Sequence, residues 1–191
     1  MRKLFTALIL FFAVLKLLAS QVHLELDTFK HIAIMDSAIK GKAYVFSDEK
    51  GNVRWQTALP FESVMITNER GVFQFEKQNG KWRKLDAKFG STVKRVVDEI
   101  RRIVVGNFGD AYDIEKSGDS LVLIPKNSAT KTFISKIVVL LRKNSQVPQS
   151  IEFIEVSGDK TIMNVVNFSE NTTYPFVFDE TKIEEFICPQ K

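Results

Sequence analysis

The chain has 191 residues, of which 45% are hydrophobic and 26% are charged. This length is sufficient for one domain with a single core. Residues 1–20 hold three basic residues and no acidic one, so without them the chain has 24 basic and 23 acidic residues. Because nucleic-acid binding depends on a concentrated basic field, this nearly neutral balance excludes nucleic acid as a partner.

The first element in chain order has the pattern of an export signal. A basic start at Met1–Lys3 precedes an apolar run over residues 4–18 that only Lys16 interrupts, and small residues follow it. A membrane-spanning helix needs about 20 apolar residues, whereas this pattern is typical of a secretory signal peptide. We expect cleavage after Ser20 or Ala19 and a single domain over residues 21–191. The alternative is an uncleaved anchor.

The stretch that follows is typical of consecutive antiparallel strands. Alternating apolar residues predict strands over residues 22–26, 29–34, 42–47, 53–57, 63–67 and 72–75. Residues 27–39 could carry a turn of helix instead. Pro60 closes the strand that begins at Val53, since proline is tolerated at strand ends but not within a ladder. Asn79-Gly80 predicts a tight turn.

The spacing of the apolar residues becomes that of a helix after Ser91. Apolar residues from Val93 to Val104 recur at helical spacing, with charged residues on the other side and Gly106 as the stop. Strands resume over residues 112–115, 121–125, 132–142, 149–156 and 161–168. Residues 179–188 are spaced for one short helix or a closing strand. The predicted fold class is α+β: an unclosed antiparallel β-barrel, a strongly curved sheet with a helical lid over an apolar concave face.

Groups suited to catalysis or metal binding are scarce. His23 and His31 have no cysteine or carboxylate at metal-ligand spacing, and Cys188 is the one cysteine. No phosphate loop or nucleophile elbow is present. We expect no catalytic residue, no metal site and no cofactor.

The aromatic residues indicate a different kind of site. Sixteen phenylalanines and two tryptophans are spread over the strands on both sides of the helix. If large side chains line the concave face and the helix covers its mouth, an apolar cavity follows. The alternative is that they are ordinary core. The predicted lipid-binding residues are Tyr44, Phe46, Trp55, Met65, Phe73 and Phe75 from the strands and Val97, Ile100 and Val104 from the helix.

A set of short motifs resembles one family along nearly the whole chain. The first half contains Phe29–Ile32, Gly41–Phe46, Val53-Arg54-Trp55, Pro60-Phe61 and Ile66–Val72; the second half contains Leu121–Pro125, Pro148–Ile151, Gly158–Thr161 and Asn164–Phe168. In their order and spacing these motifs are similar to those of the LolA-like outer-membrane lipoprotein carrier proteins.

The resemblance implies a lidded, unclosed barrel in the periplasm whose apolar interior takes up acyl chains. It implies a non-enzymatic monomeric carrier of a lipoprotein or glycolipid, with an inner-membrane donor and an outer-membrane acceptor as partners. The chain departs from the best-studied carriers at Glu49, where they have an arginine that ties the lid shut. The alternative function is an envelope sensor or protein-interaction domain on the same scaffold, without lipid transport.

Overall fold

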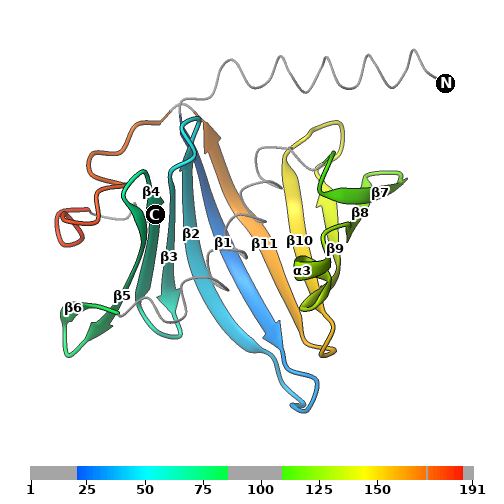
Figure 1. The fold of residues 1–191 in the computed structure, drawn as a ribbon, viewed down its shortest axis with the longest axis horizontal. Coiled ribbons are helices and arrows are strands. Elements are labelled where there is room, and N and C mark those ends of the chain that lie inside the picture. The colour runs from blue at the N-terminus through cyan, green and yellow to red at the C-terminus, as the bar shows by residue number, and fades with distance from the viewer. Residues whose placement is uncertain (1–20, 86–108, 171, 187–191) are drawn as a thin grey trace.

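The computed structural model describes residues 21–85, 109–170 and 172–186. They form one curved sheet of eleven antiparallel strands in the order β6-β5-β4-β3-β2-β1-β11-β10-β9-β8-β7 (Figure 1). The strands are β1 (Gln21–His31), β2 (Ile39–Asp48), β3 (Val53–Leu59), β4 (Ser63–Asn68), β5 (Gly71–Gln78), β6 (Lys81–Lys84), β7 (Tyr112–Ser117), β8 (Ser120–Pro125), β9 (Ile134–Leu141), β10 (Pro148–Glu155) and β11 (Lys160–Glu170).

The sheet consists of two meanders joined at their centre. Strands β1 to β6 follow one another from the centre to one edge, and β7 to β11 return from the other edge. Strands β1 and β11 then pair along ten positions, from Val22 opposite Glu170 to His31 opposite Lys160. The edge strands β6 and β7 form no pair with each other in the described chain, so the barrel is not closed. The prediction of an unclosed antiparallel sheet is confirmed.

Strand β1 corrects the prediction of two separate strands over residues 22–26 and 29–34. Asp27 and Thr28 continue the ladder opposite Lys42 and Gly41 of β2, so the polar pair does not interrupt the strand. One register shift after Glu25 on the β11 side accommodates the curvature. The structure therefore has one long central strand that ends at His31.

Two turn predictions are confirmed. Strand β3 ends at Leu59, directly before Pro60. Asn79 and Gly80 join β5 to β6 with φ angles of 51° and 76°. Positive φ at both central residues is the conformation that favours Asn-Gly in a two-residue hairpin turn.

The predicted α+β class is wrong for the described residues, which are mostly β. Their one helix is the short α3 (Ser128–Lys131), capped by Asn127, whose side-chain oxygen accepts from the Ala129 N–H at 2.8 Å. The described chain has no helix long and apolar enough to cross a membrane. The predicted signal peptide and the predicted helix over residues 93–104 lie outside the described residues.

The segment after β11 is neither the helix nor the strand that the sequence predicts. As far as it is described, residues 172–186 form successive turns. The Asp179 carboxylate accepts bonds from the N–H and hydroxyl of Thr181, at 2.9 and 2.7 Å. Such local side-chain bonds offer the backbone an alternative to a helix.

Gly41 of β2 lies where Thr28 of β1 and the end of β3 come close to the β2 backbone. A Cβ atom at this position would lie 2.6 Å from Thr28 Oγ1 and 2.7 Å from the carbonyl oxygen of Leu59. We predict that Gly41→Ala lowers the unfolding free energy by about 2 kcal/mol, because the backbone at Leu59 must shift. Denaturant titration measures this. The control is Gly109→Ala, whose Cβ would meet nothing within 4 Å; equal losses in both variants would contradict the prediction.

Candidate functional site on the inner face of the sheet

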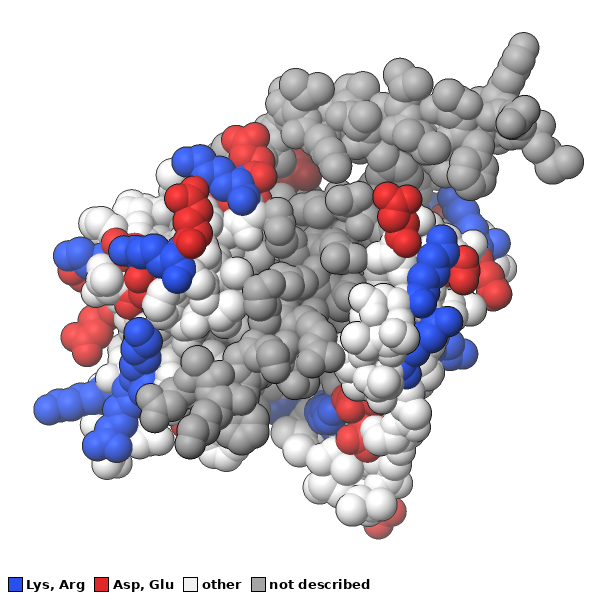
Figure 2. All heavy atoms as spheres, viewed as in Figure 1, with Lys and Arg blue, Asp and Glu red and all other residues white. Residues whose placement is uncertain are grey.

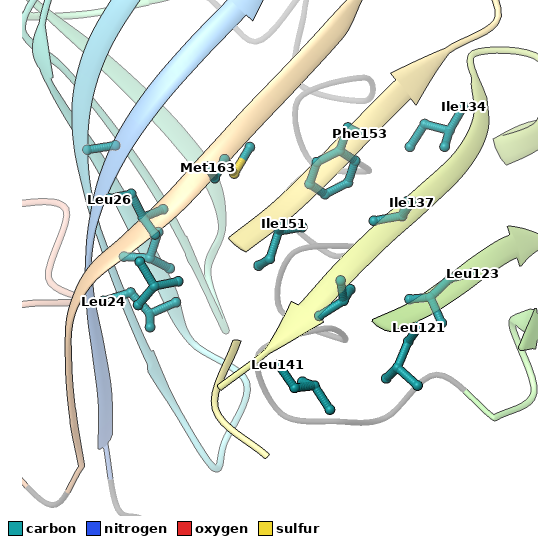
Figure 3. Close-up of a cluster of buried hydrophobic side chains, with 14 of the residues drawn as sticks. Leu24, Leu26, Leu121, Leu123, Ile134, Ile137, Leu141, Ile151, Phe153 and Met163 are labelled. Carbon is teal, nitrogen blue, oxygen red and sulfur yellow. The ribbon is translucent and has the colours of Figure 1, made fainter. Parts of the chain in front are cut away.

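Side chains that alternate along every long strand meet on one side of the sheet. This inner face extends over both meanders: Met65, Trp55, Val45 and Leu24 lie in one cross-strand row, and Ile151, Val139 and Leu121 in another. The labelled side chains in Figure 3 gather on this side, within the curve of the sheet. Its buried members are Leu24, Leu26, Ala43, Val45, Val53, Met65, Tyr112, Leu121, Leu123, Ile134, Ile137, Val139, Leu141, Ile151, Phe153, Met163 and Val165.

The inner face contains two of the predicted site residues. Trp55 lies directly opposite Met65, and both pack within the cluster. The indole N–H of Trp55 donates to Thr57 Oγ1 at 3.2 Å, so the polar atom of the ring has a partner on its own strand. The ring can therefore present an apolar surface without leaving a donor unpaired.

Four predicted site residues lie on the opposite face, which corrects the expectation that all six share one wall. The register places Tyr44, Phe46, Phe73 and Phe75 one residue out of phase with Trp55. Because side chains alternate along a strand, a shift of one residue moves a side chain to the other face. The remaining three predicted residues, Val97, Ile100 and Val104, lie outside the described residues.

The sequence prediction missed the contribution of the second meander. Leu123, Ile137 and Phe153 lie in one cross-strand row of the inner face. The alternation of Ile151, Glu152 and Phe153 was visible in the sequence and could have identified Phe153, whereas the run over residues 121–125 is apolar throughout and does not show which face Leu123 takes. What the sequence did not show was that β11 returns beside β1 and brings this meander onto the same face.

Two hydroxyl groups interrupt the apolar inner face. Ser47 and Thr67 lie on either side of Val53 in one cross-strand row. Their side-chain oxygens are buried and have no hydrogen-bond partner in the structure. Each hydroxyl can donate one hydrogen bond and accept others, so this row could bind a polar group that enters among the apolar side chains.

The outer face of β2 to β5 is covered by the segment over residues 172–186, drawn orange to red beside β4 in Figure 1. Tyr44 and Phe46 pack with Val177 and Phe186. Further along, Val64, Ile66 and Phe75 pack with Ile183. The aromatic residues that were predicted to bind lipid therefore hold this C-terminal segment against the sheet.

Arg54 of β3 binds the C-terminal segment from the side of the sheet. Its side chain is only 1% exposed. The guanidinium donates to Gln56 Oε1 at 3.1 and 3.0 Å and to the Val177 carbonyl at 3.3 Å, and its centre lies 4.1 Å from the ring centroid of Phe186. A planar, multiply bonded guanidinium can be buried in this way because its donors find acceptors.

A second contact between sheet and segment is polar and only partly buried. Asn68 donates to the Phe178 carbonyl at 3.0 Å and to Glu180 at 2.7 Å. Arg70 bridges Glu180 and Asp179 at 2.6 and 3.2 Å. The hydrogen bonds from Thr181, with help from Arg70, lower the pKa of the Asp179 carboxyl, which keeps it ionised for this contact.

The inner-face cluster consists of apolar side chains and Tyr112. The described residues contain no group of three potential metal ligands. His23 is buried on the outer face, where its ring stacks on Phe46 with centroids 4.4 Å apart and its Nδ1 lies 3.3 Å from the Tyr174 hydroxyl. Burial lowers the pKa of His23, and nearby Glu25 opposes this in part.

The lowered pKa of His23 predicts a pH dependence of stability. Its pKa in the folded chain lies below the ordinary 6.5, so the unfolded chain binds the proton more tightly. The contribution of His23 is therefore fully present above about pH 6.5 and is lost progressively as the pH falls toward the folded-state pKa. We predict that His23→Phe flattens the stability curve between about pH 7 and about pH 5.5. Denaturant titrations across this range measure it.

His31 provides the matched control, because it is exposed at the end of β1. His31→Gln should leave the slope of unfolding free energy against pH unchanged. An equal slope in the wild type and His23→Phe would show that His23 does not carry the effect.

The contacts of Arg54 predict that its geometry matters as well as its charge. Lysine cannot reproduce the flat fork that reaches Gln56, Val177 and Phe186 together. We predict that Arg54→Lys lowers the unfolding free energy by about 2 kcal/mol and speeds proteolysis within residues 172–186. Arg83→Lys, on the exposed strand β6, should change neither; unchanged proteolysis in Arg54→Lys would contradict the proposed clamp.

The comparisons with known proteins identify the family. The family model described as "Outer membrane lipoprotein carrier protein LolA" matches residues 46–178. This range includes the strands of both meanders, apart from β1 and most of β2. No curated protein sequence matches the chain closely enough to indicate a relative.

Solved structures resemble the chain weakly. A DUF1329 family protein from Desulfovibrio piger has a TM-score of 0.46 at 12% identity, over 90% of this chain and 96% of that one. A LolA superfamily protein from Nitrosomonas europaea has a TM-score of 0.44 at 10% identity, over 86% and 92%. The MucA/MucB complex of Pseudomonas aeruginosa gives 0.36 at 9% identity, over 81% of this chain and 53% of that one. The assignment rests on the family match.

Proposed function

Since the chain belongs to the LolA family of outer membrane lipoprotein carrier proteins, we propose that it is a non-enzymatic periplasmic carrier of an acylated molecule. Residues 1–20 direct its export, and residues 21–191 form a monomeric carrier domain. The cargo is a lipoprotein or a glycolipid, received from an inner-membrane donor and passed to an outer-membrane acceptor.

The observation that carries this proposal is the largely apolar inner face that extends over both meanders of an unclosed sheet. Aliphatic and aromatic side chains from both meanders form one cluster. Each methylene group removed from water contributes about 0.8 kcal/mol, so an acyl chain crossing an aqueous space gains strongly from such a surface. In the described part of the chain the edge strands β6 and β7 do not pair with each other, so the sheet is free to open around a ligand in the proposed function.

The polar end of the cargo has a candidate position on the same face. The unpartnered hydroxyls of Ser47 and Thr67 flank Val53, and they could donate to the ester or amide oxygens that join acyl chains to a headgroup. The predicted helix over residues 93–104 lies in sequence between the two edge strands. It is proposed as the lid, with Val97, Ile100 and Val104 facing the acyl chains.

The two tryptophans provide a direct test, because they lie on opposite faces. Trp55 belongs to the inner face, and Trp82 packs with Phe75 and Ile183 on the outer face. We predict that a brominated fatty acid in vesicle-free solution quenches Trp55 in a Trp82→Phe variant. Bromine quenches by contact, so Trp82 in a Trp55→Phe variant should keep its fluorescence.

A substitution pair checks that binding depends on the apolar surface. Trp55→Asp should weaken fatty-acid binding at least about tenfold, since a charge on the inner face opposes acyl burial. Val166→Asp, at an exposed position of β11, should bind like the wild type, and thermal melting of both variants confirms folding. Equal quenching of the two tryptophans, or no loss in Trp55→Asp, would overturn the inner face as the lipid site and favour the sensor or interaction-domain function.

A further inference from the structure

We propose that one end of the sheet docks on the surface of a phospholipid bilayer by inserting apolar side chains among the headgroups. This apolar end is formed by the β1–β2 loop (residues 32–38), the β3–β4 loop (residues 60–62) and the β10–β11 loop (residues 156–159), with the strand residues next to them. The inference deepens the proposed function, since a carrier of acylated molecules must approach the membranes that hold them.

All three loops lie at the lower end of the sheet in Figure 1, where the first and third are neighbours and the second lies to the left of them. The Ala33 N–H donates to Asp159 Oδ1 at 3.0 Å, which ties the first loop to the third. At the base of the same loops Lys30 forms an ion pair with Glu155. Leu59 lies opposite Lys42 at the start of β2, which brings the second loop to the same end. Loops held at their bases lose little conformational freedom on binding.

Exposed apolar side chains are concentrated at this end. The described chain exposes ten large hydrophobic residues, and six of them lie here: Ile34 (94% exposed), Phe61 (80%), Val156, Leu59, Met35 and Ile39. The lower protrusion in Figure 2 is correspondingly almost free of charged atoms. Apolar groups exposed to this extent and in this number are typical of an interaction surface.

The charges around the apolar end suit a lipid surface. Glu155 and Asp159 both pair with Lys30, and Glu62 Oε2 lies 2.8 Å from Lys77 Nζ. Each of these carboxylates therefore has a lysine partner, which weakens its repulsion of anionic headgroups. Lys40, exposed beside Ile39, adds a cation at headgroup level, which attracts anionic lipid by about 1 kcal/mol per basic residue. Asp36 is the one acidic residue of the first loop, so it limits the affinity.

The form of the surface favours a bilayer over a protein partner. The exposed side chains come from three separate loops and from the strand ends beside them. A fluid bilayer accepts such side chains without complementary pockets, and binding scales with the apolar area inserted. A protein interface needs a close-packed core over a large area.

Vesicle flotation tests the proposal on the exported protein, with its N-terminus read by mass spectrometry. Vesicles of phosphatidylcholine with phosphatidylglycerol should carry the wild type upward in a density gradient. The double variant Ile34→Ser with Phe61→Ser should bind at least about tenfold more weakly. The matched control, Ile114→Ser with Val166→Ser, removes two exposed apolar residues from other strands and should float like the wild type. Asp36→Asn should float more strongly.

A fluorescence signal from position 61 tests docking separately from any loss of fold in the serine variants. In a Trp55→Phe, Trp82→Phe background, Phe61→Trp should be quenched by brominated phospholipid in the vesicles. Failure of the wild type to float, equal flotation of both double variants, weaker flotation of Asp36→Asn, or an unquenched Phe61→Trp would each overturn the proposal. The fatty-acid test of the inner face uses no vesicles. A failure of membrane docking can therefore be distinguished from a failure of lipid binding.

Discussion

The pairing of β1 with β11 is the constraint on which the rest of the structure depends. It joins residues far apart in the sequence, such as Val22 and Glu170, and among the described strands it is the one ladder that joins the two meanders. Without this ladder each meander would expose its own apolar face. With it, the inner residues of β1 to β4 continue into those of β8 to β11 as one surface. Closing such a long loop costs entropy, which the burial of this shared face must offset.

The two faces of the first meander have different roles because side chains alternate along its strands. The inner face holds Trp55 and Met65, while the outer face holds Arg54 and the aromatic residues that bind the C-terminal segment. Arg54 is the central contact there: its buried guanidinium joins strand, segment backbone and the Phe186 ring. The segment over residues 172–186 is anchored on the outer face, so it does not cover the inner one. In the proposed function, the loops at the apolar end then bring that inner surface to a membrane.

Much of the architecture could be predicted from local sequence signals. Alternation of apolar residues identified most of the strands. Pro60 marked the end of one strand, and Asn79-Gly80 marked a hairpin turn. The misses came from tertiary pairing. Asp27 and Thr28 resemble a break in the strand, yet a partner on each side keeps them in the ladder. The predicted site combined Phe46 with Trp55 because both are large and aromatic, although their register places them on opposite faces. Size and apolarity can be read from a sequence, but the face of a side chain depends on the register of its neighbours.

The central claim is that the inner face carries an acylated molecule. Native mass spectrometry of the protein, purified from its own cell envelope without detergent exchange, tests this claim most directly. The account predicts a population whose added mass corresponds to an acylated molecule, released on collisional activation and greatly reduced in Trp55→Asp but not in Val166→Asp. A wild-type protein that arrives only at the mass of its polypeptide, or an adduct that Trp55→Asp retains in full, would contradict it.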